Sequence, residues 1–586
     1  MNFSAAFIKR PVGTSLLALG ILIAGVVAFN LLPVASLPQV EYPTIVVQAT
    51  LPGASPEIMA TSVATPLERQ LGRIAGVNEM TSRSALGSAR ITVQFDLTRD
   101  INGAARDVQA AINAARAQLP RNLINNPTYR KVNPSDAPIV ILALTSKIYT
   151  RTQLYDFAST ILQHSLAQLE GVGQVTISGG SLPAVRIELN PTTLNKYGIG
   201  LTDVRTAIMS ANVNRPKGQF SNDSARSEII SNDQMFKATQ YQPLIVAYRN
   251  NQAVRLSDVG YAIDAEEDVR NSGLFNGEPA VFLVVSKQPG ANVVETVDRI
   301  KHMLPVLKES VPAAVDLSVA LDRTTTIRSS LHDVELTLII SMILVILVVY
   351  AFLNSMRAMF IPGLAVLLSL LGSFAVMYLL GYSLDNLSLM ALTISTGFVI
   401  DDAVVVLENI TRHIENGVEP MQAAFKGVQE VSFTVISMSL SLIAVFTPIL
   451  LMGGIVGRLF HEFAVTLSIA IVVSLLVSLT ITPMMCSILL KRDLKKNAAK
   501  NPRTRFGAVI NQHYANSLRW ALAHSQLMLW LTLATIALNV LLYIIIPKGF
   551  FPQQDTGRVS ATIQAQQDIS FQAMKQKLTQ FVNIIG

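Results

Sequence analysis

Two adjacent carboxylates lie inside an apolar stretch of the sequence. Asp401 and Asp402 belong to the segment TGFVIDDAVVVLENI, residues 396–410, and the apolar run around them covers residues 387–407. A run of this length can cross a bilayer core of about 30 Å. Because a single acid inside a bilayer costs about 2.5–3.5 kcal/mol on insertion scales, two adjacent acids indicate a functional site.

The chemistry that this pair predicts is reversible proton binding. Repulsion between the carboxylates and their desolvation favour a proton on at least one, which can then bind and leave near neutral pH. Small or polar residues occupy the neighbouring turns, and Gly397, one turn before Asp401, leaves room for water or another side chain: Thr393, Ser395, Thr396, Gly397 and Ala403. The alternative, a surface helix cap, is disfavoured because AVVVLENI continues the apolar run to Glu408 and Arg412.

The composition is that of a membrane protein with large water-exposed parts. Half of the 586 residues are hydrophobic (50%) and 15% are charged. The single cysteine, Cys486, excludes an intrachain disulfide. Seven apolar runs are long enough to span a bilayer: Val12–Leu32, Val334–Leu353, Phe360–Leu380, Leu387–Leu407, Val431–Met452, Phe463–Leu490 and Leu527–Ile546.

Lysine and arginine predict the orientation of these spans. Lys9 and Arg10 precede the first run and place residues 1–11 in the cytoplasm, together with the basic loop 491–526. Residues 33–333 then lie on the outer side, and residues 547–586 return there. The first run, residues 12–32, is longer than the apolar part of a typical signal peptide, so a retained anchor is expected rather than a cleaved one. No span offers a Lys or Arg at the depth of the acids, so their cationic partner is expected outside this sequence.

The outer region repeats itself at an offset of 95 residues. TIVVQAT (44–50) aligns with IVILALT (139–145), and Gly76 aligns with Gly171. Each copy reads strand, helix, strand, strand, helix, which indicates stacked split βαβ units. A third, looser copy starts at AVFLVVS (280–286). Between the copies, the polar stretch 214–233 is either an ordinary surface loop or an extended arm that reaches a neighbour.

A longer repeat relates the first and the seventh spans. LLPVASLPQVEY (31–42) follows the first span and IIPKGFFPQQDT (545–556) follows the seventh, with the same spacing of Pro and Pro-Gln. Strand-like residues follow each, RVSATIQA (558–565) in the second case. Internal duplication is typical of secondary transporters. The chain is therefore expected to hold one half and the start of another, to insert and fold locally, and not to transport alone.

These motifs resemble the resistance–nodulation–cell division (RND) transporters, in the hydrophobe/amphiphile multidrug efflux branch. GFVIDDAVVVLENI, the large outer insertion and the restarting repeat carry the resemblance, and PGASPEIMATSVATPLERQL and VSLTITPMMCSILL are similar to the Mdt-type inner-membrane pump subunits. The resemblance implies a helical transmembrane bundle of about twelve spans, seven of them in residues 12–32, 334–490 and 527–546. It also implies a large α+β periplasmic insertion of split βαβ porter subdomains, with a docking arm at about 211–235.

The same resemblance implies a function. Asp401 and Asp402 would be the proton-relay acids of a drug/proton antiporter in a bacterial inner membrane. Its partners would be amphiphilic small molecules, protons, a periplasmic adaptor protein, an outer-membrane channel and further pump subunits in a homo- or hetero-trimer. No enzymatic activity, cofactor, metal or nucleic acid is implied. The substrate-binding residues stay open, since Pro138 and Ser178 stand where drug pumps of the family place phenylalanines.

Other classes of protein remain as alternatives. A heavy-metal or other exporter of the same superfamily typically has one acid followed by alanine at this motif, whereas this chain has Asp-Asp. An inactive membrane scaffold with an unused acid pair is the alternative without transport. An ATP-driven pump is disfavoured because the sequence has no G-x-x-x-x-G-K-[ST] motif.

Overall fold

The computed structural model describes most of the chain in two compact units. One unit is residues 1–135 with 326–558, and the other is residues 136–325 with 559–586. The described residues are 3–35, 37–38, 42–121, 123, 125–133, 137–213, 216–230, 234–288, 290–353, 355–490, 503–547, 557, 559–566 and 569–585. The docking arm, the basic loop and the segment after the seventh span therefore fall partly outside the described residues, at 214–215, 231–233, 491–502, 548–556, 558, 567–568 and 586.

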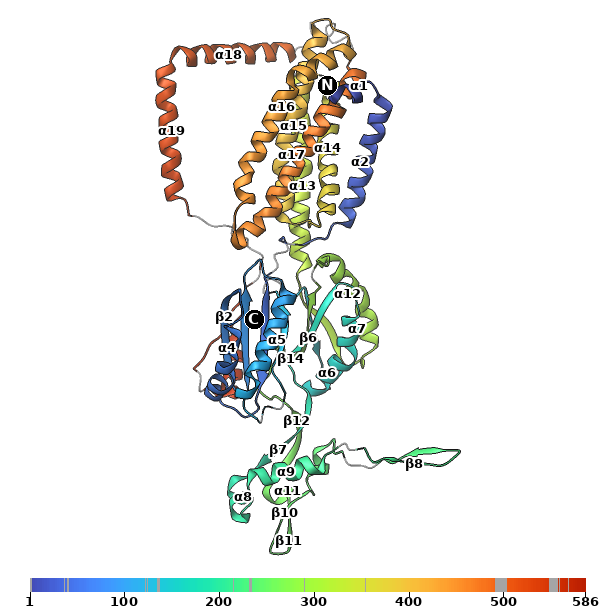
Figure 1. Cartoon of the computed structure of the whole chain (residues 1–586), viewed down its shortest axis with the longest axis vertical. Helices are drawn as coiled ribbons and strands as arrows, with labels where there is room; N and C mark the ends of the chain where they lie inside the picture. Colours follow the sequence, from blue (N-terminus) through green and yellow to red (C-terminus); the bar gives the residue numbers. More distant parts are fainter. Residues whose placement is uncertain are drawn as a thin grey trace. The chain divides into compact units, whose positions relative to one another are not determined.

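Seven helices in the described residues are long and apolar enough to cross a membrane, which confirms the predicted number of spans. They are α2 (Pro11–Leu31), α13 (Thr324–Leu353), α14 (Met356–Leu379), α15 (Asn386–Glu415), α16 (Pro420–Leu450), α17 (Gly454–Leu489) and α19 (Ser525–Ile545). Two further helices, α1 (Phe3–Ile8) and α18 (Arg503–Ala523), precede α2 and α19. Figure 1 shows α14, α15 and α17 side by side in the bundle.

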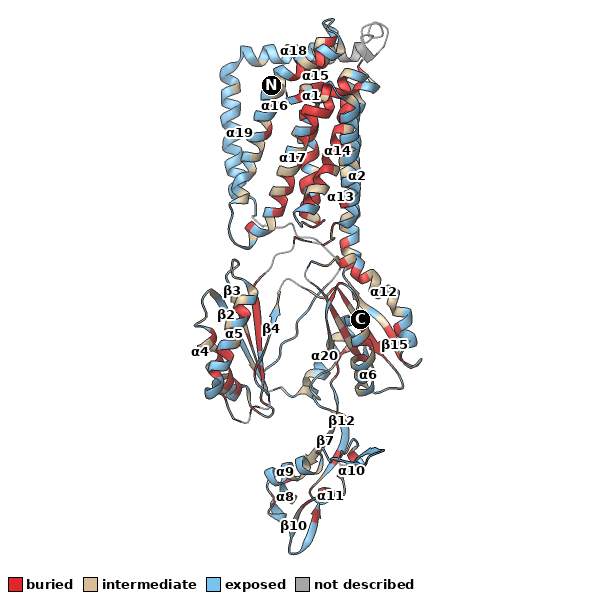
Figure 2. Cartoon of the chain, turned by 45° about the vertical axis from the view of Figure 1, so that its right-hand side comes forward, coloured by how far each residue is buried: buried red, intermediate tan, exposed pale blue. Residues whose placement is uncertain are grey.

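The core of the bundle lies between α14, α15 and α17. More than half of the apolar window of each of these three helices is buried, whereas α13, α16 and α19 are largely exposed, as the red segments in Figure 2 show. Val406 and Ile410 of α15 pack with Ile361 of α14 and Cys486 of α17 in one apolar cluster. A helix that is apolar all round is stable only when buried or in lipid, so the exposed helices present surfaces suited to a membrane.

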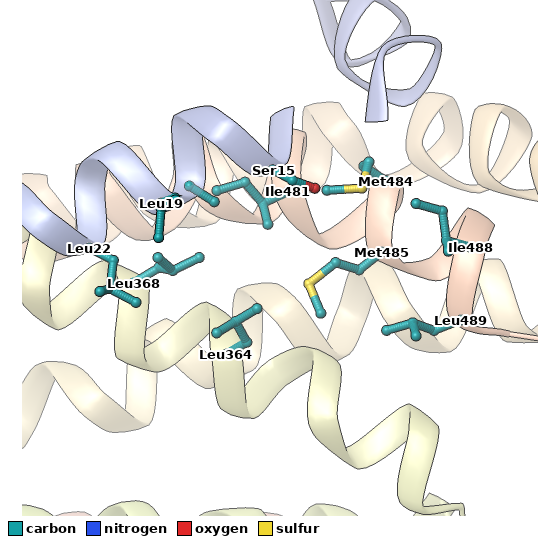
Figure 3. Close-up of a pocket in the computed structure, with 11 residues that line it drawn as sticks. Ser15, Leu19, Leu22, Leu364, Leu368, Ile481, Met484, Met485, Ile488 and Leu489 are labelled. Carbon is teal, nitrogen blue, oxygen red and sulfur yellow. The ribbon is translucent and has the colours of Figure 1, made fainter. Parts of the chain in front are cut away.

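An apolar groove opens between α2, α14 and α17 (Figure 3). Its volume is about 350 Å³, and Leu22, Leu368 and Met485 are among its walls. Ser15 is its one polar lining residue. Because no ionisable group reaches it, this groove has no means of handling a proton.

The first unit also contains a four-stranded antiparallel sheet. Its order is β2-β3-β1-β4, and its strands are β1 (Thr44–Thr50), β2 (Val77–Ala85), β3 (Ser88–Phe95) and β4 (Thr128–Val132). The helical segments that cover it are α3 (Pro56–Ile58), η1 (Met59–Ala64), α4 (Thr65–Leu71), α5 (Ile101–Ala115) and η2 (Arg116–Gln118). Ile45 of β1, Ile91 of β3 and Val108 of α5 meet in its core.

The second unit contains a sheet built from two of the sequence repeats. It has the order β13-β14-β5-β15, with β6 also paired to β14. The strands are β5 (Val140–Thr145), β6 (Val172–Ser178), β13 (Leu274–Phe275), β14 (Glu278–Lys287) and β15 (Asp316–Asp322), and the helical segments are α6 (Arg151–Phe157), η3 (Ala158–Leu162), α7 (Gln163–Ala167) and α12 (Val293–Glu309). The third copy thus supplies β14 to the sheet of the second copy. Gly76 and Gly171 have φ of 81° and 90°, a left-handed conformation that favours glycine before each following strand.

A two-stranded ribbon leads from this sheet to a smaller subdomain. The ribbon pairs β7 (Pro183–Leu189) with β12 (Gly260–Glu266). The subdomain contains α8 (Pro191–Tyr197), α9 (Leu201–Ala211), α10 (Ala238–Tyr241), β10 (Ile245–Arg249), β11 (Gln252–Arg255) and α11 (Leu256–Val259). In the arm region, β8 (Gln219–Ser221) and β9 (Arg226–Glu228) form a hairpin whose residues are all exposed, and Figure 1 shows it projecting from the subdomain.

The segment after the seventh span contains one helix, α20 (Phe571–Ile585). The strand-like residues 558–565 form no strand over their described part, 559–565. A strand is stable only when neighbouring strands satisfy its backbone groups, and high β-propensity alone does not supply them.

Candidate functional site

Asp401 and Asp402 lie near the middle of α15 and face different surroundings. Successive residues of a helix point about 100° apart, so the two carboxylates cannot share one environment. Asp402 is 7% exposed and lies among the buried residues of α15, whereas Asp401 is exposed.

The buried carboxylate has a hydroxyl partner on the neighbouring helix. Ser474 of α17 lies 3.2 Å from Oδ2 of Asp402 and 3.3 Å from the backbone oxygen of Val399. Since a hydroxyl has one hydrogen, Ser474 can donate to the carboxylate or to the carbonyl, but not to both. The arrangement therefore links the charge of Asp402 to the contact between α15 and α17.

Asp401 faces a groove beside α16. The groove has a volume of about 560 Å³ and contains both carboxylates. Hydroxyl groups of α16 line much of the rest, together with two aromatic rings: Thr434, Ser437, Ser439, Ser441, Phe398 and Phe433. A carboxylate in such a groove can be hydrated or can meet a polar partner, which lowers the cost of its charge.

Some buried hydroxyl groups of α16 and α17 have no hydrogen-bond partner among the described residues. Ser439 of α16 is 2% exposed, lines the same groove, and its hydroxyl is unpartnered; Ser478 and Thr482 of α17 are in the same condition. Buried polar groups normally bond to protein or to ordered water. The hydroxyl of Ser439 is therefore available to water in the groove or to the carboxylates.

The polar residues that lie close to Asp401 and Asp402 in the sequence form hydrogen bonds within α15. The hydroxyls of Thr393, Ser395 and Thr396 bond to backbone carbonyls of their own helix, at Leu389 and Leu392. A methyl group added at Gly397 would meet no atom within 4 Å, which agrees with the predicted space beside Asp401. Among the described residues, no basic side chain forms an ion pair with either carboxylate.

Sequence reasoning missed a second pair of buried acids. Glu462 of α17 is 8% exposed, and Asp385 at the start of α15 is fully buried. Burial raises the pKa of Asp385 to about 6, although hydrogen bonds from Ser388, Ser383 and Leu387 oppose the shift. The pattern Asp385…Ser388 could have identified the helix cap, but nothing in the sequence joins residues as distant as Asp385 and Glu462.

Comparisons with known proteins find relatives that match this chain along its whole length. The model of the AcrB/AcrD/AcrF family matches residues 3–586. The chain is 59% identical over 590 residues to proteins named "Multidrug resistance protein MdtC" from Yersinia pseudotuberculosis serotype O:3 (strain YPIII) and from Yersinia enterocolitica serotype O:8 / biotype 1B. In both cases all of this chain is covered, and it spans 57% of the length of the relative.

Proposed function

Because the chain belongs to the AcrB/AcrD/AcrF family, within the RND superfamily, we propose that it is part of a proton-driven multidrug efflux transporter. The relatives at 59% identity carry the name of multidrug resistance proteins, which supports small amphiphilic molecules as the exported substrates. The reaction would be antiport of a substrate and protons across the inner membrane, without a cofactor.

The contact between Asp402 and Ser474 is the single observation that carries this proposal. When Asp402 is ionised, its carboxylate attracts the Ser474 hydroxyl, 3.2 Å away. When a proton neutralises Asp402, that attraction weakens and Ser474 can donate to the carbonyl of Val399 instead. Proton binding would thus change how α15 and α17 are held together, and helices with two arrangements can transmit such a change.

Asp401 would act beside Asp402 from the groove. Its exposed carboxylate can exchange protons with water in the groove or pair with a cation from another segment. Two acids with different surroundings can hold one proton and one negative charge, and this avoids the repulsion of two buried charges.

We also propose roles for the outer regions. The two sheets would be split βαβ porter subdomains within residues 33–333, on the periplasmic side. The exposed β8–β9 hairpin would be a docking arm for a neighbouring subunit of a homo- or hetero-trimer. A periplasmic adaptor protein and an outer-membrane channel would complete the export path.

Transport in vesicles tests the function. A full-length version of this subunit, with its companion subunits, is reconstituted with an imposed pH gradient and a fluorescent amphiphile. We expect Asp402→Asn and Asp401→Asn to abolish gradient-dependent transport while the protein still inserts. The matched control is Glu408→Gln, which changes an exposed acid on the same helix and should transport normally. Wild-type transport by Asp402→Asn would show that the pair is not the proton site.

A further inference from the structure

A second pair of carboxylates lies where α15 and α17 begin, away from Asp401 and Asp402. Asp385 is the residue before α15, and Glu462 lies in the third turn of α17. The loop between α14 and α15 brings Ser383 between them. Asp385, Glu462 and Ser383 are 0%, 8% and 4% exposed, so the cluster is buried in the first unit.

Ser383 bridges the two acids. Its backbone N–H donates to Oε1 of Glu462 at 2.7 Å, and its hydroxyl donates to Oδ2 of Asp385 at 3.0 Å. Oδ1 of Asp385 accepts two further bonds, from the N–H groups of Leu387 and Ser388 at 2.8 and 2.9 Å. Asp385 thus has both oxygens occupied, whereas the hydrogen bonds of Glu462 all end on Oε1.

No positive charge compensates the pair. Among the described residues, neither carboxylate forms an ion pair. Tyr382 is the remaining ionisable residue of the loop, and its pKa is raised by burial and by the charge of Glu462. In the described residues, the other ionisable groups in the first turns of α13 and α17 are exposed side chains: Arg328, His332, Asp333, Glu335, Arg458 and His461. Two unpaired negative charges in a buried site would repel each other strongly.

The hydrogen bonds decide which acid holds a proton. Three donors and the positive end of the α15 dipole stabilise Asp385 in its charged form. Glu462 has one backbone donor at short distance and a second, longer contact at 3.4 Å from the Ser383 hydroxyl. We propose that Glu462 binds a proton in the folded chain, on Oε2, while Asp385 stays ionised as the cap of α15. Glu462 keeps a small exposed fraction that Asp385 lacks.

A buried hydroxyl next to Glu462 supports a proton-exchanging site. Thr466 lies one turn further along α17, so its side chain neighbours that of Glu462 on the helix surface. It is fully buried, and its hydroxyl has no hydrogen-bond partner among the described residues. A protonated carboxyl group or a water molecule beside Glu462 would satisfy it.

The proton on Glu462 would also affect the contact between the loop after α14 and the segment that leads from α2 to the first sheet. Leu384, next to Ser383, forms a parallel bridge with Val34, and two backbone bonds fix the bridge: Leu384 N to Pro33 O at 2.8 Å and Ala35 N to Leu384 O at 3.1 Å. Residues 33–35 connect α2 with β1. If Glu462 loses its proton, both acids that contact Ser383 carry a negative charge. Their repulsion would weaken the contacts that hold this loop.

The role of Glu462 in transport rests on the proposed function, but the binding of a proton by Glu462 does not. In a proton-driven transporter, Glu462 would bind a proton at the end of the bundle where α14 ends and α15 and α17 begin, which the distribution of basic residues predicts to be the outer side. The proton would then be present at the loop contacts that hold residues 33–35, remote in the chain from Asp402.

Infrared difference spectroscopy of the full 586-residue chain in lipid nanodiscs tests the proposal. A pH titration should show the carbonyl band of a protonated carboxyl group that disappears as the pH rises. We expect Glu462→Gln to lose this band and Asp402→Asn to keep it. In the unsubstituted chain, ¹³C-labelled glutamate should shift the band of Glu462, whereas any band from Asp401 or Asp402 shifts only with ¹³C-labelled aspartate. The labelling assigns the proton even if the Gln variant fails to fold.

Each other outcome contradicts the proposal. If Glu462→Gln removes no band, or if labelled glutamate shifts none, the proton lies elsewhere. A band that sodium chloride removes, relative to the same ionic strength of a bulky organic cation, would show that the site takes a metal cation instead. Since the readout is a bound proton, a failure of efflux by the full transporter would leave the result unchanged.

Discussion

Asp402 and Asp385 are both buried carboxylates of α15, but their hydrogen-bond donors differ in kind. Asp402 accepts from one hydroxyl, on another helix, that can rotate to a different acceptor. Asp385 accepts from the Ser383 hydroxyl and also from two backbone N–H groups that the start of α15 holds in place. A rotating donor suits an acid that gains and loses a proton, whereas fixed donors suit an acid that caps a helix.

The stability of the chain should depend on the titration of Asp385. Its pKa is raised from 3.8 to about 6, mainly by burial, so the folded state favours the protonated form. The resulting stability is present below pH 3.8 and is lost as the pH rises through about 6. We expect the free energy of unfolding to fall across this window by up to about 3 kcal/mol more in the wild type than in Asp385→Asn, as measured by denaturant titration at a series of pH values. Equal pH profiles for the two proteins would contradict the assignment.

Gly25 sets the distance between α2 and α14. A Cβ atom there would lie 2.3 Å from the backbone oxygen of Leu371, and a backbone atom cannot rotate away. We expect Gly25→Ala to lower the free energy of unfolding by about 1–3 kcal/mol, measured by denaturant titration in detergent. Gly20→Ala is the matched control on the same helix, since no atom lies within 4 Å of its Cβ position. Because alanine favours a helix more than glycine does, a destabilisation of similar size at Gly20 would show that the close approach to Leu371 is not its cause.

Among the elements, α12 depends on the residue that precedes it. Oδ1 of Asn292 accepts from the N–H groups of Val294 and Glu295 at 3.0 and 3.3 Å, and α12 then buries Val297 and Ile300 against the second sheet. Asn292→Ala should cost about 1 kcal/mol in unfolding free energy, because two N–H groups lose their acceptor. Asn292→Asp keeps the acceptor and should cost little. Chemical denaturation of the three proteins checks the order, and equal losses for Ala and Asp would exclude the capping role.

The ribbon formed by β7 and β12 is held at one end by an ion pair. Nε and Nη2 of Arg151 on α6 donate to the two oxygens of Glu266 on β12 at 2.9 and 2.8 Å. Both side chains are mostly buried, so Arg151→Ala leaves a carboxylate without its partner, at a cost of about 1–3 kcal/mol. We expect faster amide hydrogen exchange in 183–189 and 260–266, and partial recovery in the double variant Arg151→Met/Glu266→Gln. Unchanged exchange in Arg151→Ala would show that strand pairing alone fixes the ribbon.

For the whole molecule, the distribution of basic residues predicts which parts face the cytoplasm. The chain has a single native cysteine, Cys486, which is buried and therefore suits cysteine labelling as a silent background. In intact spheroplasts, Ser221→Cys in the exposed β8–β9 hairpin should react with a membrane-impermeant maleimide, and Ser517→Cys in α18 should react only after lysis. Both positions are exposed serines, so their local reactivity is comparable. The opposite pattern would overturn the orientation.

The sequence by itself determined the elements and the acid pair. The length of the apolar runs predicted seven spanning helices, and the offset of 95 residues predicted the repeat that pairs Gly76 with Gly171. The positions of Lys and Arg predicted the orientation. All three are local or periodic properties of the sequence. Two acids inside an apolar run stand out for the same reason, because the cost of a charge in lipid does not depend on distant residues. The proposal that Asp401 and Asp402 bind a proton therefore starts from the sequence alone.

Only the tertiary structure decided which groups these elements bring together. Ser474 is one serine among many until α17 packs beside α15 and places it against Asp402. Glu462 resembles a helix-end residue until the loop with Ser383 covers it, and β14 joins the sheet of another repeat because its register there pairs it with both β5 and β6. Burial, pairing and proton binding depend on neighbours that are distant in the chain, and the packing of helices and sheets fixes those neighbours.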